Sequence, residues 1–290
     1  MVLSAERKSV FNTLISTTEL SNHLNDPNWV IFDCRFTLTD VEAGHRAYQI
    51  DHIPGAQYVH LDNDLSSPIT AKSGRHPLPD PEELSHKLGQ WGVDATKQVI
   101  VYDDSFGSIA ARMWWLLHWL GHEAVALLDG GFSKWRREGL PLTAELPKVT
   151  PAQFKQKRDD SLWVDSEFVA KEIAEGKILL IDARAEERFL GDIEPLDKVA
   201  GHVPGAINIP YEDNLDFGGD FLPEDELRQF YQENLRHKSP ENVVLMCGSG
   251  VTACHTILAM EQVGLHGVKL YAGSWSEWIT DNKRPVAKGE

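Results

Sequence analysis

The sequence of 290 residues is 42% hydrophobic and 25% charged, which is typical of soluble globular proteins and allows one large domain or two of ordinary size. Its 28 Lys and Arg residues against 44 Asp and Glu residues give a net charge of −16, and a field of that sign argues against nucleic acid or an anionic membrane surface as a partner. No apolar run reaches the length of a membrane span, and Glu6, Arg7 and Lys8 interrupt the N-terminal stretch where a signal peptide is apolar, so we expect a cytoplasmic protein.

Short β-branched runs alternate with segments of helical spacing along the chain. This alternation predicts an α/β fold in which parallel strands form a sheet with helices on both faces, and functional groups gather at the carboxyl ends of such strands. In chain order we expect a strand at 29–33, a helix at 81–92, a strand at 98–103, a helix at 111–121, strands at 124–131 and 243–246, a helix at 252–263 and a strand at 268–273.

Four motifs occur twice, in the same order and at offsets between 143 and 150 residues. Such a long period indicates two homologous domains rather than a solenoid. We therefore predict tandem domains at 1–142 and 161–290, joined by a polar linker over 143–160. The motif pairs are "IFDCRF" (31–36) with "LIDARA" (180–185), "DHIPGAQYVHL" (51–61) with "GHVPGAINIPY" (201–211), "QVIVYDD" (98–104) with "NVVLMCG" (242–248), and "GGFSKW" (130–135) with "GSWSEW" (273–278).

Three scattered cysteines suit a reducing compartment, and the absence of CxxC spacing gives no indication of a structural zinc site. Cys247 lies on a tight turn between the strand at 243–246 and the following helix, where Gly248 and Gly250 let several backbone N–H groups converge. Those donors and the positive end of the helix favour a thiolate. The alternative is a buried, inert cysteine beside glycines that only make the turn.

Two other interpretations of the glycine-rich turn are weaker. Residues 248–253 match G-x-G-x-x-A, a dinucleotide fingerprint, but no acidic residue ends the strand at 268–273 to hold a ribose. A cysteine phosphatase loop needs an arginine that clamps phosphate, and residues 248–254 contain no basic residue. The neutral loop therefore suits a thiolate or persulfide better than a phosphate dianion.

The loop "CGSGVTA", the two "H[IV]PGA" repeats, the paired D-x-R motif and the closing "GSWSEW" together resemble the two-domain rhodanese family, and within it the 3-mercaptopyruvate sulfurtransferases. The resemblance implies two rhodanese-like domains and transfer of sulfane sulfur through a persulfide on Cys247, with no metal or nucleotide cofactor. Asp103 aligns with Cys247 in the first half and cannot carry sulfur, so the first domain is expected to be catalytically silent.

The same resemblance suggests roles for further residues. The loop amides at Gly248, Gly250, Val251 and Thr252 would bind the transferred sulfur. Arg188 falls on the family's substrate-binding arginine and would hold a small anionic sulfur donor, whereas Arg184, like Arg35 in the first half, is expected to be structural. A proton relay would join Ser249 to His76 and Asp64 of the first domain.

Two positions qualify these expectations. Family members that use mercaptopyruvate commonly carry a second arginine nine residues after the first, where this chain has Asp197. Cys254 lies two helical turns after Cys247 and is expected to pack in the core, with a resolving role as the alternative.

We therefore expect an enzyme that moves sulfur from 3-mercaptopyruvate to a thiol acceptor, such as thioredoxin or a small dithiol, or to cyanide. Thiosulfate is the alternative donor, although a thiosulfate enzyme is expected to have basic residues in the loop that follows Cys247. A non-enzymatic sulfur carrier or interaction module on the same scaffold is the alternative from a different functional class.

Overall fold

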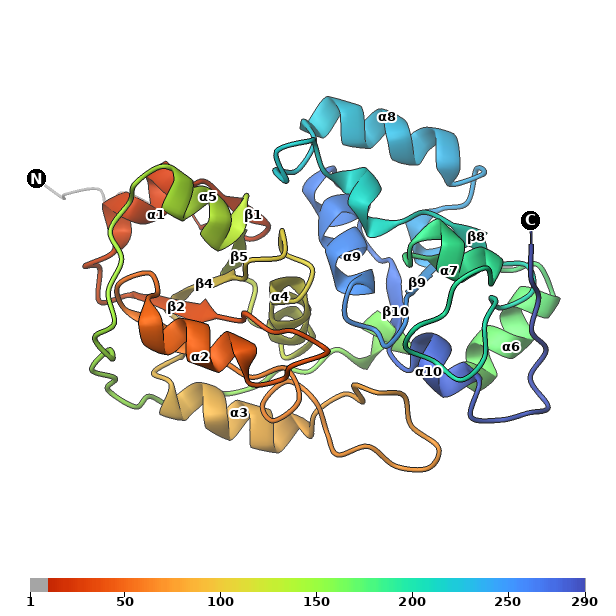
Figure 1. Cartoon of the computed structure of the whole chain (residues 1–290), viewed down its shortest axis with the longest axis horizontal. Helices are drawn as coiled ribbons and strands as arrows, with labels where there is room; N and C mark the ends of the chain where they lie inside the picture. Colours follow the sequence, from red (N-terminus) through yellow and green to blue (C-terminus); the bar gives the residue numbers. More distant parts are fainter. Residues whose placement is uncertain (1–9, 290) are drawn as a thin grey trace, which may run out of the picture.

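The computed structural model describes residues 10–289, so the N-terminal stretch with Glu6, Arg7 and Lys8 lies outside the described residues. Two five-stranded sheets are present, in the strand orders β1-β5-β4-β2-β3 and β6-β10-β9-β7-β8, and the strands of each pair in parallel. The two halves lie side by side, and helices α4 and α9 face one another between them (Figure 1).

The first half contains, in chain order, β1 (Leu14–Ile15), α1 (Thr17–His23), β2 (Trp29–Asp33), α2 (Ala43–Ile50), β3 (Ala56–Tyr58), α3 (Pro81–Gln90), β4 (Gln98–Tyr102), α4 (Ala110–Trp119), β5 (Val125–Leu128) and α5 (Gly131–Arg137). The second half contains β6 (Trp163–Val164), α6 (Ser166–Ala174), β7 (Leu179–Asp182), α7 (Glu186–Leu190), β8 (Ile207–Asn208), α8 (Glu224–Asn234), β9 (Val243–Met246), α9 (Ala253–Gln262), β10 (Lys269–Tyr271) and α10 (Ser274–Trp278). Every strand and helix expected from the sequence is present, within a few residues of its expected bounds.

Alternation along the strands divides each core into two layers, because successive side chains of a strand point to opposite faces. In β2, Val30 and Phe32 pack with α3 and α4, whereas Ile31 packs with α1 and α5 on the other face. In β9, Val243 and Leu245 pack with α8 and α9, whereas Val244 and Met246 pack with α6 and α10. The expectation of parallel sheets with helices on both faces is confirmed.

The layer that contains α4 and α9 is continuous across the two halves, since one buried apolar cluster includes Trp115 of α4 and Ile257 of α9. A shared core of this kind holds the halves in one orientation. The chain between them, residues 144–159, forms no helix or strand and lies along the first half, where Ala152 N–H donates to Gly89 and Lys157 N–H donates to Leu120. Within residues 10–289, no helix is long and apolar enough to cross a membrane.

Each half contains the same buried ion pair at the end of an inner strand, β2 in the first half and β7 in the second. Arg35 donates to the Asp33 carboxylate at 2.6 Å, and Arg184 donates to Asp182 at the same distance. Each guanidinium also donates to a backbone carbonyl at 2.7 Å and lies over an aromatic ring, at 4.1 Å from the Phe132 centroid and 4.8 Å from that of Trp275. This geometry agrees with the structural role expected for both arginines.

We predict that Arg35→Met lowers the free energy of unfolding by about 3–5 kcal/mol, because the wholly buried Asp33 carboxylate loses its cation. The matched control is Arg46→Met, which breaks an exposed pair with Asp40 and should lower the free energy of unfolding far less. Urea unfolding followed by circular dichroism checks both, and equal losses in the two variants would contradict the assigned role.

Candidate active site

Cys247 follows β9 directly, and its side chain is buried. Its carbonyl oxygen accepts a hydrogen bond from Trp275 N–H at 3.0 Å, and its own N–H donates to Ser274 Oγ at 3.1 Å. The residue is thus held at both backbone groups by the start of α10. The expected strand-to-helix turn is present, and α9 begins six residues after Cys247.

Two glycines allow the turn to take its shape. Gly250 has φ +77°, and a Cβ built there would lie 2.3 Å from the carbonyl oxygen of Ala272. At Gly248 an added Cβ would lie 2.7 Å from Nη2 of Arg75 and 3.5 Å from Nη1 of Arg188. Glycine at 248 therefore lets two guanidinium groups approach the backbone beside Cys247.

The equivalent turn of the first half shows what this backbone can bind. The Asp103 carboxylate, at the position of Cys247, accepts hydrogen bonds at 2.8 Å from four N–H groups, those of Ser105, Gly107, Ile109 and Ala110. In the second half, the N–H groups of residues 248–252 donate to no backbone oxygen within the described residues. A turn of this design surrounds a negative group with backbone donors.

Cys247 opens onto a cavity of about 70 Å³ that both halves line. From the second half the lining contains the expected Gly248, Ser249, Val251, Thr252 and Arg188, together with Leu196. Leu38, Leu61, Arg75, His76 and Ile109 line it from the first half. The expected Gly250 does not line the cavity, since its role is in the turn behind it.

A chain of hydrogen bonds runs from this cavity into the first half. His76 Nδ1 lies 2.7 Å from Ser249 Oγ, and His76 Nε2 lies 3.2 Å from a carboxylate oxygen of Asp62. Burial lowers the pKa of His76, and the hydrogen bond from His76 lowers the pKa of Asp62. Near neutral pH the imidazole is therefore uncharged and the carboxylate ionised, which suits proton transfer.

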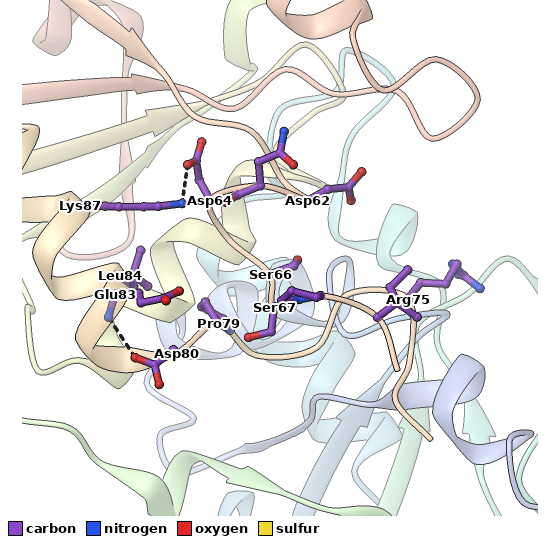
Figure 2. A pocket seen from close by; sticks show the side chains of 13 residues that line it. Asp62, Asp64, Ser66, Ser67, Arg75, Pro79, Asp80, Glu83, Leu84 and Lys87 are labelled. Atoms are coloured by element: carbon purple, nitrogen blue, oxygen red, sulfur yellow. Dashed lines mark hydrogen bonds and ion pairs between the residues drawn. The ribbon is translucent and has the colours of Figure 1, made fainter. Parts of the chain in front are cut away.

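The expected contact between Asp64 and His76 is wrong, because Asp62 takes that place. The Asp64 carboxylate accepts from His60 N–H at 2.9 Å and from Lys87 Nζ at 2.7 Å. Both carboxylates border a neighbouring pocket of about 460 Å³, in which Asp64 and Lys87 meet at one side and Arg75 lies at the other (Figure 2). In this non-repetitive loop, sequence spacing does not determine which of the two aspartates contacts His76.

Arg75 is the functional candidate that sequence reasoning missed. It lines both the Cys247 cavity and the pocket of Figure 2, and it bonds Asp197 of the other half. Arg188 donates to Glu194 at 2.9 Å and to Asp197 at 3.1 Å. The signal available in the sequence was only its position next to His76 in "GRHPLP".

Arg112 of α4 lies wholly buried behind the turn. Its guanidinium donates to the carbonyl oxygen of Gly250 at 3.0 Å and to that of His76 at 3.1 Å. It therefore ties the cysteine loop to the histidine loop, although no sequence motif marked it.

The other two cysteines are buried in the core. Cys34 contacts Met113 Sδ at 3.8 Å, and Cys254 Sγ lies 3.3 Å from the Gly250 carbonyl oxygen. Burial raises the pKa of Cys34, and it raises that of Cys254 to about 12. Both thiols therefore stay protonated near neutral pH, in agreement with a packing role for Cys254.

Comparisons with known proteins agree with this architecture. A rhodanese-like domain is recognised twice, over residues 16–138 and 165–281. The chain is 47% identical over 279 residues to a Pseudomonas aeruginosa protein named "Probable 3-mercaptopyruvate sulfurtransferase", covering 96% of this chain and 98% of that protein. It is 33% identical over 283 residues to the thiosulfate sulfurtransferase of Mus musculus, covering 93% of each. The crystal structure of SseA from Escherichia coli, a 3-mercaptopyruvate sulfotransferase, superposes with a TM-score of 0.78 at 31% identity, covering 93% of this chain and all of SseA.

We predict that a neutral alkylating reagent such as iodoacetamide modifies Cys247 while Cys34 and Cys254 stay unmodified. Cys247 faces a cavity beside two guanidinium groups, whereas burial keeps the other two thiols protonated. Mass spectrometry of the peptides after alkylation near pH 8 measures this. Modification of Cys254 at the rate of Cys247 would contradict the assignment.

Proposed function

The chain belongs to the rhodanese family and is a sulfurtransferase, and from this premise we propose that Cys247 carries the transferred sulfur as a persulfide. The proposed donor is 3-mercaptopyruvate, and the acceptor is a thiol or cyanide. The observation that supports this most directly is the cavity itself. Cys247, Ser249, His76 and one arginine from each half line it, and Asp62 contacts His76 from outside it.

The first step is attack of the Cys247 thiolate on the sulfur of the donor. An S–S bond forms, the donor C–S bond breaks, and its electron pair leaves with pyruvate enolate. The amides of 248–252 would then hold the negative terminal sulfur, as the corresponding turn of the first half holds the Asp103 carboxylate. Attack by an acceptor thiolate or cyanide on the terminal sulfur breaks the S–S bond and restores the Cys247 thiolate.

Protonation of the enolate is assigned to the relay. Neutral His76, whose Nε2–H faces Asp62, would take the donor's thiol proton through Ser249 Oγ, which lies in the cavity. Asp62 orients the imidazole and stabilises the imidazolium that forms. The imidazolium would then return the proton through Ser249 to the enolate carbon, so that pyruvate leaves and Cys247 carries an ionised terminal sulfur.

The donor's carboxylate is assigned to Arg188 and Arg75, which approach Gly248 from opposite halves. Mercaptopyruvate is favoured over thiosulfate because residues 248–252 are neutral. Thiosulfate is the second candidate donor, since the mouse relative is named for it.

Catalysis is assigned to the second domain, at 161–290, with 1–142 as the silent domain and 143–160 as the linker. The first domain nonetheless supplies His76, Asp62 and Arg75. A small dithiol or thioredoxin is the proposed physiological acceptor, and three free thiols support a reducing, cytoplasmic location. Because the relatives are enzymes, the non-enzymatic carrier considered above is set aside.

Cys247→Ser is expected to lower turnover with 3-mercaptopyruvate and a thiol acceptor by more than about 1,000-fold, because a hydroxyl cannot carry sulfane sulfur. Cys254→Ser, the matched control seven residues away, should keep most of the activity. Mass spectrometry of the wild-type protein after donor alone should show one added sulfur on the Cys247 peptide. Substantial turnover by Cys247→Ser would refute the proposal.

Asp62→Asn is expected to lower kcat with mercaptopyruvate by about 10–100-fold, because the imidazole loses its anionic partner. Asp64→Asn should change kcat by less than about twofold, since Asp64 pairs with Lys87 outside the relay. With thiosulfate the leaving sulfite needs no proton, so Asp62→Asn should leave that reaction nearly unchanged. Steady-state kinetics with both donors measures this, and an equal loss with both would exclude a relay role.

A further inference from the structure

The Asp197 carboxylate bridges the two arginines that are assigned to the donor. One of its carboxylate oxygens bonds Arg75 of the first half, and the other accepts from Arg188 of the second half at 3.1 Å. Its side chain is only 5% exposed, so this carboxylate is buried against two arginines that line the cavity. Arg75 keeps a buried Nε–H without an acceptor among the described residues.

The position of Asp197 is itself held by hydrogen bonds. Its N–H donates to Glu194 at 3.0 Å, and the same Glu194 binds Arg188 through both carboxylate oxygens. Burial acts to raise the pKa of Glu194, but the hydrogen bond from Arg188 and those from two backbone N–H groups outweigh it and lower the pKa. Glu194 is therefore ionised, and the four side chains Arg75, Arg188, Glu194 and Asp197 form a connected cluster of two cations and two anions.

On the proposed function given above, we infer that Asp197 sets the charge of the donor: it makes the site prefer a monoanionic donor, such as a mercapto keto acid, over the thiosulfate dianion. A positive side chain at 197 would give the cluster a net charge of +2 and a neutral one would give +1, whereas Asp197 leaves it neutral. The preference follows from the cluster's charge, because the energy of a donor in an electrostatic field is proportional to the donor's own charge.

Asp197 affects donor binding in two ways, through its contacts with the arginines and through its repulsion of the donor, and comparing two donors separates them. The arginines must exchange some contact with Asp197 for contact with the donor, and this cost is the same for every donor, so it cancels in a ratio of two donors. The repulsion between the Asp197 carboxylate and the donor does not cancel, because a dianion feels it twice as strongly as a monoanion. The change in the thiosulfate-to-mercaptopyruvate ratio of kcat/KM when Asp197 is replaced therefore reports the charge effect.

The test uses Asp197→Asn in the full-length protein, with cyanide as the acceptor for both donors. The expected result is a rise of about tenfold in the thiosulfate-to-mercaptopyruvate ratio of kcat/KM, shrinking at high ionic strength. The matched control is Asp192→Asn, which removes one exposed charge from the same loop and should change the ratio by less than about twofold. Arg75→Gln removes a cation and should move the ratio in the opposite direction by a similar factor.

Binding is measured separately from turnover by protection of Cys247 against iodoacetamide, with sulfate as the dianion and pyruvate as the monoanion. Asp197→Asn should lower the concentration of each anion that protects Cys247. The concentration of sulfate should fall by a larger factor than that of pyruvate. This readout distinguishes the two proposals, because it needs no persulfide chemistry: failure of the wild type to use either donor would refute the proposed function alone. An unchanged sulfate-to-pyruvate ratio in Asp197→Asn, or an equal change in Asp192→Asn, would overturn the inference.

Discussion

A fully buried guanidinium joins the two halves of the molecule at the proposed reaction site. Arg112 of α4 donates to the carbonyl oxygen of Gly250 behind the cysteine turn and to that of His76 in the opposite half. Burying a charge without a carboxylate is costly, and within the described residues Arg112 forms no ion pair. The continuous core around α4 and α9 supports this arrangement, so the Ser249–His76 contact depends on packing that neither half makes alone.

The two halves use one turn in two ways. In the first, a carboxylate on the chain itself fills the ring of backbone N–H groups, which supports the proposal that this half is catalytically silent. In the second, the shorter Cys247 side chain at the same place leaves the N–H groups of 248–252 for the terminal sulfur of the proposed persulfide. Duplication of one domain therefore accounts for the two forms of the same turn.

Two arginines lie beside Cys247 in a chain whose net charge is negative. A net charge of −16 repels small anions, and binding an anionic donor requires cations concentrated at one place. Arg75 and Arg188 meet at Gly248, and Glu194 and Asp197 hold them there. The same two carboxylates therefore orient the arginines and reduce the attraction of the arginines for an anion.

The sequence by itself determined the features that depend on neighbouring residues. The repeated motifs predicted two α/β halves, and the apolar run Val243–Met246 before Gly248 placed Cys247 on a strand-to-helix turn, because strand period and glycine conformation are local properties. Arg188 and Ser249 were found by their position in motifs and do line the Cys247 cavity. Only the tertiary structure placed Asp62 rather than Asp64 beside His76, brought Arg75 to Asp197, and set Arg112 behind the turn. These contacts join separate loops or opposite halves, and their geometry is fixed by how two sheets pack through α4 and α9 rather than by any spacing along the chain.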